Sequence, residues 1–296
     1  MTLDIGTLWA ERFIIEGVLG VGGMGTVYRA ADTLLDGEMV ALKILHPNLA
    51  TEEPPRHRFI NEVRLSRKVT HQNVVRTLDF GIGEQIPFFS MELIEGNVAR
   101  DLCSSSLLPF ARVYQTLLQI VDGLHAIHET RILHRDLKGG NVFIDGRGVV
   151  KIGDFGVACP ASHVEVSDGR ITGSARYLAP EVWRGQSFDY RADLYALGIL
   201  SYELSIGKPP IDGESFEELM CKHLSDSIAP LNAVRPEIPR WFSDMTQRLL
   251  EKNFTARPSS AREVAELMRS HHITTPCSLE QETPVKAKFS SKNFKL

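Results

Sequence analysis

The segment HRDLKGGN, at residues 134–141, constrains this chain more than any other. It places an acid, Asp136, a base, Lys138, and an amide, Asn141, close together, with two glycines just before the amide. Alone, it also fits a polar turn that Asp136 caps and a strand that Asn141 begins. A further acid, Asp154, follows in DFG at 154–156. The segment is thus either a catalytic loop or a polar turn after a helix.

A glycine cluster lies near the N-terminus, in LGVGGMGTV at residues 19–27. Gly20, Gly22 and Gly25 connect two strand-like runs, and residues without side chains let backbone N–H groups approach phosphate oxygens. The pattern alone fits any tight turn. Because these glycines join strand to strand, they differ from a dinucleotide fingerprint, which passes from strand into helix.

Lys43 lies inside the strand-like run VALKIL, where a lysine is unusual. It could face water from an edge strand. Alternatively, its ammonium points inward at phosphates and is held by a carboxylate, for which Glu62 on the following helix is the candidate. Glu52 and Glu53 precede Pro54-Pro55, and we expect them to lie in a loop.

The arrangement of periodic segments predicts an α+β chain with a small, mainly antiparallel β lobe and a larger, mainly helical lobe. We expect an N-terminal extension at 1–12, the small lobe at 13–93, the large lobe at 94–272 and a flexible tail at 273–296. The expected strands of the small lobe are 13–20, 25–32, 39–45, 74–82 and 86–93, with one helix at 56–69. The expected helices of the large lobe are 113–129, 192–207, 241–252 and 259–272, with two short strands within 141–156.

Bulk composition excludes several classes of protein. A net charge of −4 over 296 residues argues against a nucleic-acid binder. Four widely spaced cysteines form no metal-binding pattern and predict reduced thiols in a reducing compartment. We find no signal-peptide pattern and no apolar run of the roughly 18–20 residues that cross a bilayer. We therefore expect a soluble, cytoplasmic protein.

Taken together and in order, these motifs resemble those of a eukaryotic-type (Hanks-type) Ser/Thr protein kinase, in wording close to the bacterial members. The resemblance runs from about residue 13 to 270 and includes APE at 179–181. It implies a bilobed fold that transfers the γ-phosphate of ATP to Ser or Thr hydroxyls of proteins in signalling, with autophosphorylation. Mg²⁺ is the implied metal, and Mn²⁺ is an alternative.

The resemblance also implies roles for individual residues. Asp136 would orient the substrate hydroxyl, Lys138 would neutralise the γ-phosphate, and Asn141 and Asp154 would hold Mg²⁺. Lys43, fixed by Glu62, would contact the α- and β-phosphates. The residues implied to bind ATP are Leu19, Gly20, Gly22, Gly25, Val27, Ala41, Lys43, Met91, Glu92, Ile94 and Phe143, with Met91 as gatekeeper.

Three further sets of residues carry structural roles by the same resemblance. Glu181 would pair with Arg257, and Asp193 would hold the backbone of the catalytic loop. A lone acid in that apolar helix is costly unless it is bonded. His134 and Phe155 would stack in the core.

Several positions depart from the family pattern. Gly139 replaces the usual proline, so the catalytic loop loses a constraint on φ. Ser174 replaces threonine, and its hydroxyl could still bond Asp136 and Lys138. Ser66 and Thr77 replace apolar residues that stack on Phe155, so we expect looser packing of the active arrangement.

Regulation and partners are less constrained by the sequence. Arg135 resembles the arginine that binds an activation-loop phosphate. Ser167 and Thr172 are the candidate phosphosites, unless Asp168 supplies a permanent charge. The basic face of the Glu62 helix could dock an acidic partner or simply be solvated. We expect protein substrates and no nucleic acid, and a homodimer through the small lobe is an option.

Two other functions compete with an active protein kinase. A pseudokinase scaffold would have lost Lys43, Asp136, Asn141 or Asp154, and all four are present. A small-molecule phosphotransferase would lack the peptide-docking segment GSARYLAPE at 173–181, which is also present.

Overall fold

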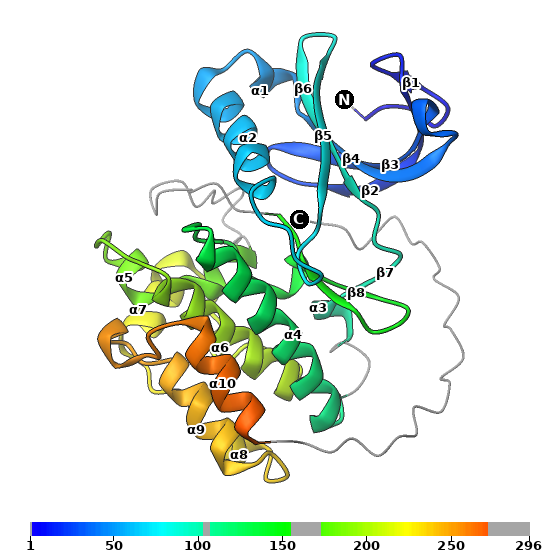
Figure 1. Ribbon diagram of the computed structural model, residues 1–296. Coiled ribbons are helices and arrows are strands. Elements are labelled where there is room, and N and C mark those ends of the chain that lie inside the picture. The colour runs from blue at the N-terminus through cyan, green and yellow to red at the C-terminus, as the bar shows by residue number, and fades with distance from the viewer. Residues whose placement is uncertain (1, 103–106, 155–172, 272–296) are drawn as a thin grey trace. The chain divides into compact units, whose positions relative to one another are not determined.

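Residues 2–102, 107–154 and 173–271 are described by the computed structural model of the chain (Figure 1). The chain divides between Gly96 and Asn97 into two units, which we treat separately. Some of the residues named above lie outside the described part. These are Phe155, Ser167, Asp168 and Thr172, the Ser174 side chain, and the tail at 273–296.

The first unit is built on a six-stranded sheet with the strand order β1-β2-β3-β4-β6-β5. All of its neighbouring strands are antiparallel. The strands are β1 (Leu8–Trp9), β2 (Phe13–Val21), β3 (Gly25–Asp32), β4 (Glu38–Leu45), β5 (Thr77–Gly83) and β6 (Ile86–Glu92), with a 3₁₀ turn, η1, at Thr33–Leu35. Residues before 13, which we expected to form an extension, thus contribute an edge strand, because the buried Trp9 packs into the sheet's core.

Alternation along the strands gives this sheet two buried faces. Tyr28, Leu42 and Phe88 belong to one apolar cluster, together with Phe13 and Trp9. Phe89 points to the other side, where its ring lies 5.3 Å from that of Phe59 on α2. The second face therefore carries the helix that holds Glu62.

The helix α2 (Glu53–Ser66) begins three residues earlier than predicted, and it ends three residues earlier. Pro54 and Pro55 lie in its first turn. A proline is accommodated there because its fixed φ is helical and no helical partner exists for the missing N–H. The prediction of a loop at Glu53 was wrong for this reason. A short helix, α1 (Pro47–Ala50), also lies in the stretch expected to be loop.

The second unit is mainly helical. Its long helices are α4 (Phe110–Glu129), α6 (Arg191–Ile206), α9 (Arg240–Leu249) and α10 (Ala261–Ser270), and α4 packs against α6 and α10 (Figure 1). A three-stranded sheet, in the order β7-β8-β9, comprises Gly96–Val98, Val142–Asp145 and Val150–Ile152. The helix α7 (Phe216–Ser225) is as long as α9 and α10. The shorter elements are α3 (Ala99–Leu102), α5 (Pro180–Trp183), α8 (Leu231–Val234), η2 (Gly139–Asn141), η4 (Gly173–Tyr177) and η5 (Phe254–Ala256).

A buried ion pair holds the helical unit together. The Arg257 guanidinium donates to both carboxylate oxygens of Glu181, at 2.6 and 2.8 Å, and also to the backbone carbonyl of Arg191. The Glu181–Arg257 pair expected from the sequence is therefore present. Across the described residues, no helix combines the length and apolar character needed to cross a membrane.

Candidate active site

The glycine-containing hairpin joins β2 to β3 in the first unit. Its strands pair from Phe13↔Asp32 to Val21↔Thr26, and the Gly22 N–H donates to the Gly25 carbonyl at 2.9 Å. A Cβ at Gly25 would lie 2.4 Å from the carbonyl oxygen of Ile44, so only glycine fits there. Leu19, Gly20 and Gly22 thus lie on a strand-turn-strand element, as the sequence predicted, with its backbone in close contact with β4.

Four of the expected ATP-binding residues share one face of this sheet. Val27 is directly opposite Lys43, and Ala41 is directly opposite Met91. Directly paired residues project to the same side, and so do residues two apart on one strand. Val27 and Ala41 are buried, so the face offers an apolar surface beside the ammonium of Lys43.

Lys43 is held from the adjoining helix. Its Nζ donates to Glu62 Oε1 at 2.7 Å, and both side chains are largely buried. The ammonium also lies 5.7 Å from the centre of the Phe89 ring. Lys43 therefore does not face water from an edge strand, since β4 lies between β3 and β6.

His46, which we did not single out from the sequence, fastens the glycine hairpin to β4. Its backbone N–H donates to the Met24 carbonyl at 2.9 Å, and its Nε2 lies 3.3 Å from the Thr26 hydroxyl. Burial lowers the pKa of His46, which favours the neutral ring at physiological pH. In the sequence, the only indication of this role was the position of a histidine directly after the strand that contains Lys43.

The segment after Met91 leads out of the sheet. The backbone N–H of Glu92 donates to the Arg76 carbonyl at 3.0 Å, so that N–H is already engaged within the chain. Ile94 lies between β6 and β7 and is half-buried. Glu92 is thus the last residue of β6, and Ile94 lies two residues beyond it.

The catalytic-loop candidates meet in the second unit. Lys138 Nζ donates to Asp136 Oδ2 at 2.8 Å, and the Asn141 amide donates to the same oxygen at 2.9 Å. The Asn141 amide also donates to the backbone carbonyl of Asp136 at 2.9 Å. The acid, the base and the amide therefore form one cluster, and the turn that Asn141 closes orients the carboxylate.

Asn141 and Asp154 flank the β8–β9 hairpin. Val142 pairs with Ile152, and the Gly153 N–H donates to the Asn141 carbonyl at 2.9 Å. Asp154 therefore directly follows Gly153, whose backbone is bonded to Asn141. Phe143 is half-buried on β8.

The side-chain oxygen of Asn141 fits a role in cation binding. Asn141 is 1% exposed, and within the described residues its Oδ1 has no hydrogen-bond partner. A buried orphan acceptor is costly unless a ligand completes it. No group of three or more His, Cys, Asp or Glu side chains that could hold a metal occurs in the described residues. Mg²⁺ usually keeps several waters and binds one or two protein oxygens together with substrate phosphates, so it does not require such a group.

Asp193, at the start of α6, holds the loop's backbone. Its two oxygens accept from the consecutive N–H groups of His134 and Arg135, both at 2.8 Å, and from the His128 ring at 2.9 Å. Burial opposes ionisation of Asp193, but these bonds and charges outweigh it and keep its pKa below the ordinary value. The role predicted for Asp193 is therefore present in the structure.

The backbone beside Asp136 is conformationally unusual. Arg135 has a φ of 66° and Asp154 a φ of 50°, in the left-handed region that non-glycine residues rarely adopt. His134 is fully buried, and burial lowers its pKa, so its ring is neutral. Its Nε2 lies 3.1 Å from the Gly153 carbonyl, and its Nδ1 accepts from the Asp136 N–H. The loop is thus held in place by Asp193 on one side and His134 on the other.

The double glycine has a packing role. A Cβ at Gly139 would lie 3.1 Å from the backbone nitrogen of Arg100, so α3 rests directly on this loop. The Gly139 N–H approaches the Tyr177 hydroxyl at 3.5 Å, and that hydroxyl donates to the buried Glu203. Burial raises the pKa of both Tyr177 and Glu203. Glu203 could have been noticed as a second acid in an otherwise apolar helix.

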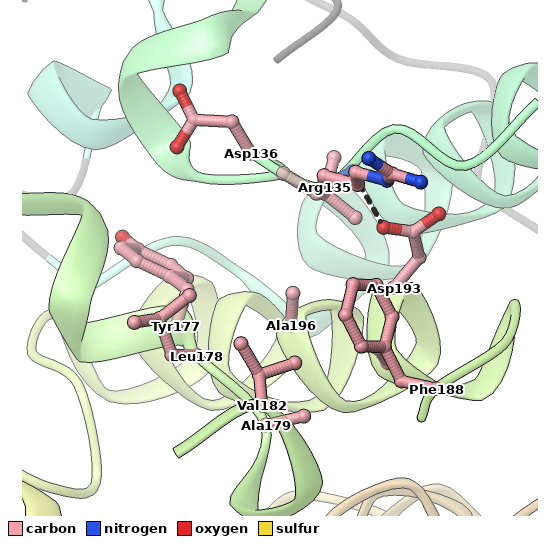
Figure 2. Close-up of a pocket in the computed structure, with 11 residues that line it drawn as sticks. Arg135, Asp136, Tyr177, Leu178, Ala179, Val182, Phe188, Asp193 and Ala196 are labelled. Carbon is pink, nitrogen blue, oxygen red and sulfur yellow. Dashed lines mark hydrogen bonds between the residues drawn. The ribbon is translucent and has the colours of Figure 1, made fainter. Parts of the chain in front are cut away.

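A pocket opens beside Asp136 in the second unit (Figure 2). Figure 2 shows Asp136 and Tyr177 at one side of it and Val182 and Phe188 at another. The other residues that line it are Arg135, Leu137, Leu178, Ala179, Ala192, Asp193 and Ala196. The pocket thus combines the Asp136 carboxylate with apolar side chains from residues 178–196.

Comparison with known proteins identifies the family. Residues 13–272 match the family model described as the protein kinase domain. The chain belongs to the protein kinase family. The expected fold class is confirmed, since the antiparallel first unit and the helical second unit are those of this family's fold.

Curated relatives of this chain include bacterial kinases. It is 37% identical over 270 residues to the serine/threonine-protein kinase pkn2 of Myxococcus xanthus, covering 88% of this chain and 32% of that one. It is 36% identical over 273 residues to the DNA damage-responsive serine/threonine-protein kinase RqkA of Deinococcus radiodurans, covering 90% and 40%. The chain spans about a third to a half of the length of the curated relatives it matches.

Solved structures agree with the family assignment. The kinase domain of Mycobacterium tuberculosis PknI superposes with a TM-score of 0.71 at 27% identity, covering 91% of this chain and 99% of that one. The resemblance of the chain to bacterial Hanks-type kinases is therefore confirmed.

Proposed function

We propose that this protein is an active Ser/Thr protein kinase that transfers the γ-phosphate of ATP to protein hydroxyls, including its own. The arrangement of Asp136, Lys138 and Asn141 is the observation that carries this proposal. Phosphoryl transfer requires positioning and charge neutralisation more than covalent help, and this cluster supplies a carboxylate, an ammonium and a cation ligand within one loop.

Each unit contributes its own groups to the reaction. In the first, Lys43 held by Glu62 contacts the α- and β-phosphates, and the glycine hairpin with Val27, Ala41 and Met91 binds the rest of the nucleotide. The backbone of Glu92 and of Ile94 meets the adenine. In the second, Asp136 receives the hydroxyl proton, Lys138 neutralises the γ-phosphate and Phe143 contacts the base.

Asn141 and Asp154 hold Mg²⁺, or Mn²⁺ in its place, and the metal's contribution is to neutralise charge on the phosphates. The Asn141 Oδ1 atom supports this assignment, because it is buried and has no hydrogen-bond partner in the described residues. A protein substrate is supported by the apolar pocket beside Asp136, which a small-molecule substrate would not require.

We place the kinase in the cytoplasm, where ATP is available and widely spaced cysteines stay reduced. A homodimer through the first unit remains a prediction.

The test is incorporation of phosphate from ATP into the protein itself and into generic protein substrates. We expect Asp136→Asn to abolish incorporation, whereas Asp244→Asn, at an exposed residue of α9, should leave it unchanged. Equal incorporation by wild type and Asp136→Asn would favour a scaffold that does not transfer phosphate.

A further inference from the structure

The Ser66 and Thr77 hydroxyls bond to each other instead of leaving a gap. The two oxygens lie 2.7 Å apart, and Ser66 is 5% exposed. The looser packing that we expected at these positions concerned their contact with Phe155, which lies outside the described residues. In the first unit they form a direct link between the end of α2 and the beginning of β5.

The direction of this link follows from donor counting. The single proton of the Ser66 hydroxyl goes to the Val63 carbonyl, at 3.0 Å. Thr77 must therefore be the donor in the bond with Ser66. The result is a short chain, from Thr77 to Ser66 to the helix backbone, in which each hydroxyl polarises the next.

The position of Ser66 ties this chain to the lysine site. Ser66 follows Glu62 by four residues, so the two side chains lie on the same face of α2, one turn apart. Glu62 bonds to Lys43 on β4, while Ser66 bonds to Thr77 on β5. Thr77 pairs with Met91 on β6, and Met91 pairs with Ala41 on β4.

We propose that the Ser66–Thr77 hydrogen bond is a positioning contact that sets the rotation of α2 and thereby aims Glu62 at Lys43. The Glu62–Lys43 and Ser66–Thr77 contacts lie one helical turn apart. Together they restrict both the rotation of α2 about its axis and its position along the sheet, which a single contact would not. Of the apolar side chains of α2, Pro55, Phe59 and Val63 are buried, and Phe59 and Val63 pack with Leu45 and Phe89 of the sheet. The Ser66–Thr77 bond adds a polar contact at the C-terminal end of the helix. The consequence for phosphate transfer rests on the proposed function.

The test uses Thr77→Val, which removes the donor and keeps the shape, in the full-length chain. Thr246→Val is the matched control, because the buried Thr246 of α9 also donates one hydrogen bond, to the Phe242 carbonyl at 2.9 Å. We expect Thr77→Val to slow turnover roughly threefold to tenfold, as the loss of one net hydrogen bond would. Ser66→Ala is the second variant, to be used if Thr77→Val fails to fold, with the same expectation.

Two readouts separate positioning from plain stability. In a Glu62→Gln background, adding Thr77→Val should slow turnover much less than in wild type, because both changes act through one group. Amide hydrogen exchange of residues 53–66 should be faster in Thr77→Val and unchanged in Thr246→Val. Equal exchange in wild type and Thr77→Val, or additive losses in the double variant, would overturn the proposal. If the wild type transfers no phosphate, the proposed function fails and the exchange measurement still decides on the contact.

Discussion

Gly139 of the catalytic loop lies directly against the backbone of Arg100 on α3. A Cβ at Gly139 would come within 3.1 Å of the Arg100 nitrogen and 3.3 Å of its Cα, which is closer than well-packed atoms allow. Such a contact is tighter than most that real Cβ atoms make, so a larger residue at position 139 would require Arg100 to shift by a few tenths of an ångström. The rigidity of the loop comes from Asp193 and His134 and does not require a proline.

Gly139→Ala should therefore destabilise the second unit by about 1–2 kcal/mol through overpacking, and it should lower turnover. Gly139→Pro should have a larger effect, since it also removes the N–H that approaches Tyr177. Gly146→Ala is the control, because no atom lies within 4 Å of a Cβ there. Thermal unfolding and phosphate incorporation check both effects. Wild-type behaviour of Gly139→Ala would show that α3 can move away.

Asn141→Ala should raise the Mg²⁺ concentration needed for half-maximal turnover by roughly tenfold or more, because a cation would lose a preformed ligand. The measurement is a Mg²⁺ titration of phosphate incorporation at fixed ATP. Asn232→Ala, whose amide group bonds to Ser243 away from this loop, is the control. An unchanged Mg²⁺ requirement would mean that the buried Oδ1 serves another purpose.

The acid sensitivity of folding should depend on His223. Burial lowers its pKa to about 3, so the folded protein keeps this ring neutral while the unfolded chain protonates it near pH 6.5. The stability it contributes is thus complete above about pH 6.5 and is lost as the pH falls toward 3, at up to about 1.4 kcal/mol per pH unit.

His223→Asn should flatten this dependence. Asparagine can still bond to the Tyr195 hydroxyl, which lies 2.9 Å from the His223 Nδ1, but it does not titrate. Denaturant unfolding at pH 7, 6, 5 and 4 compares the two chains. Parallel curves would contradict a neutral buried ring.

The β5–β6 turn offers a stabilising change. Glu84 and Gln85 have φ values of 50° and 68°, the conformation in which asparagine and glycine are favoured. Glu84→Asn with Gln85→Gly should raise the free energy of unfolding of the first unit by about 0.4–1 kcal/mol and leave turnover unchanged. Gly37→Ala, at a φ of 83°, should do the opposite. A lower melting temperature for the double variant would exclude strain at this turn.

Glu181→Gln should destabilise the second unit by about 3–5 kcal/mol, because it leaves the buried Arg257 guanidinium without a charged partner. Asp244→Asn breaks the exposed Arg240–Asp244 pair and should cost less than about 1 kcal/mol. Chemical unfolding measures both. Equal losses would mean that water reaches Arg257.

Local patterns accounted for much of the first unit. Short β-type runs between turn signals indicated its main strands. A lysine inside one strand with an acid on the next helix was enough to propose the Lys43–Glu62 pair. The start of α2 was missed because Pro54-Pro55 signals either a loop or a first helical turn, and the sequence does not distinguish them.

Contacts between distant segments could not be predicted. Arg100 and Gly139 are in contact because α3 packs on the catalytic loop, and neither residue's type indicates this contact in the sequence. Ser66 and Thr77 were read as two separate polar substitutions, since hydroxyl pairing depends on rotamers that the sequence does not encode. The role of Asp193 was predicted from the family resemblance, and the cost of an unbonded acid in an apolar helix supported it. Glu203 is a second acid in the same helix and could have been noticed for the same reason.

If Asn141 and Asp154 hold Mg²⁺ as proposed, both ligands come from the two ends of one β8–β9 hairpin. They flank a short ladder, and the Gly153–Asn141 hydrogen bond closes that end of it. Once one oxygen holds a cation, the other stands at high effective concentration, whatever the first unit does. A change in the position of Glu62 relative to Lys43 would then alter turnover without altering the affinity of the catalytic loop for metal.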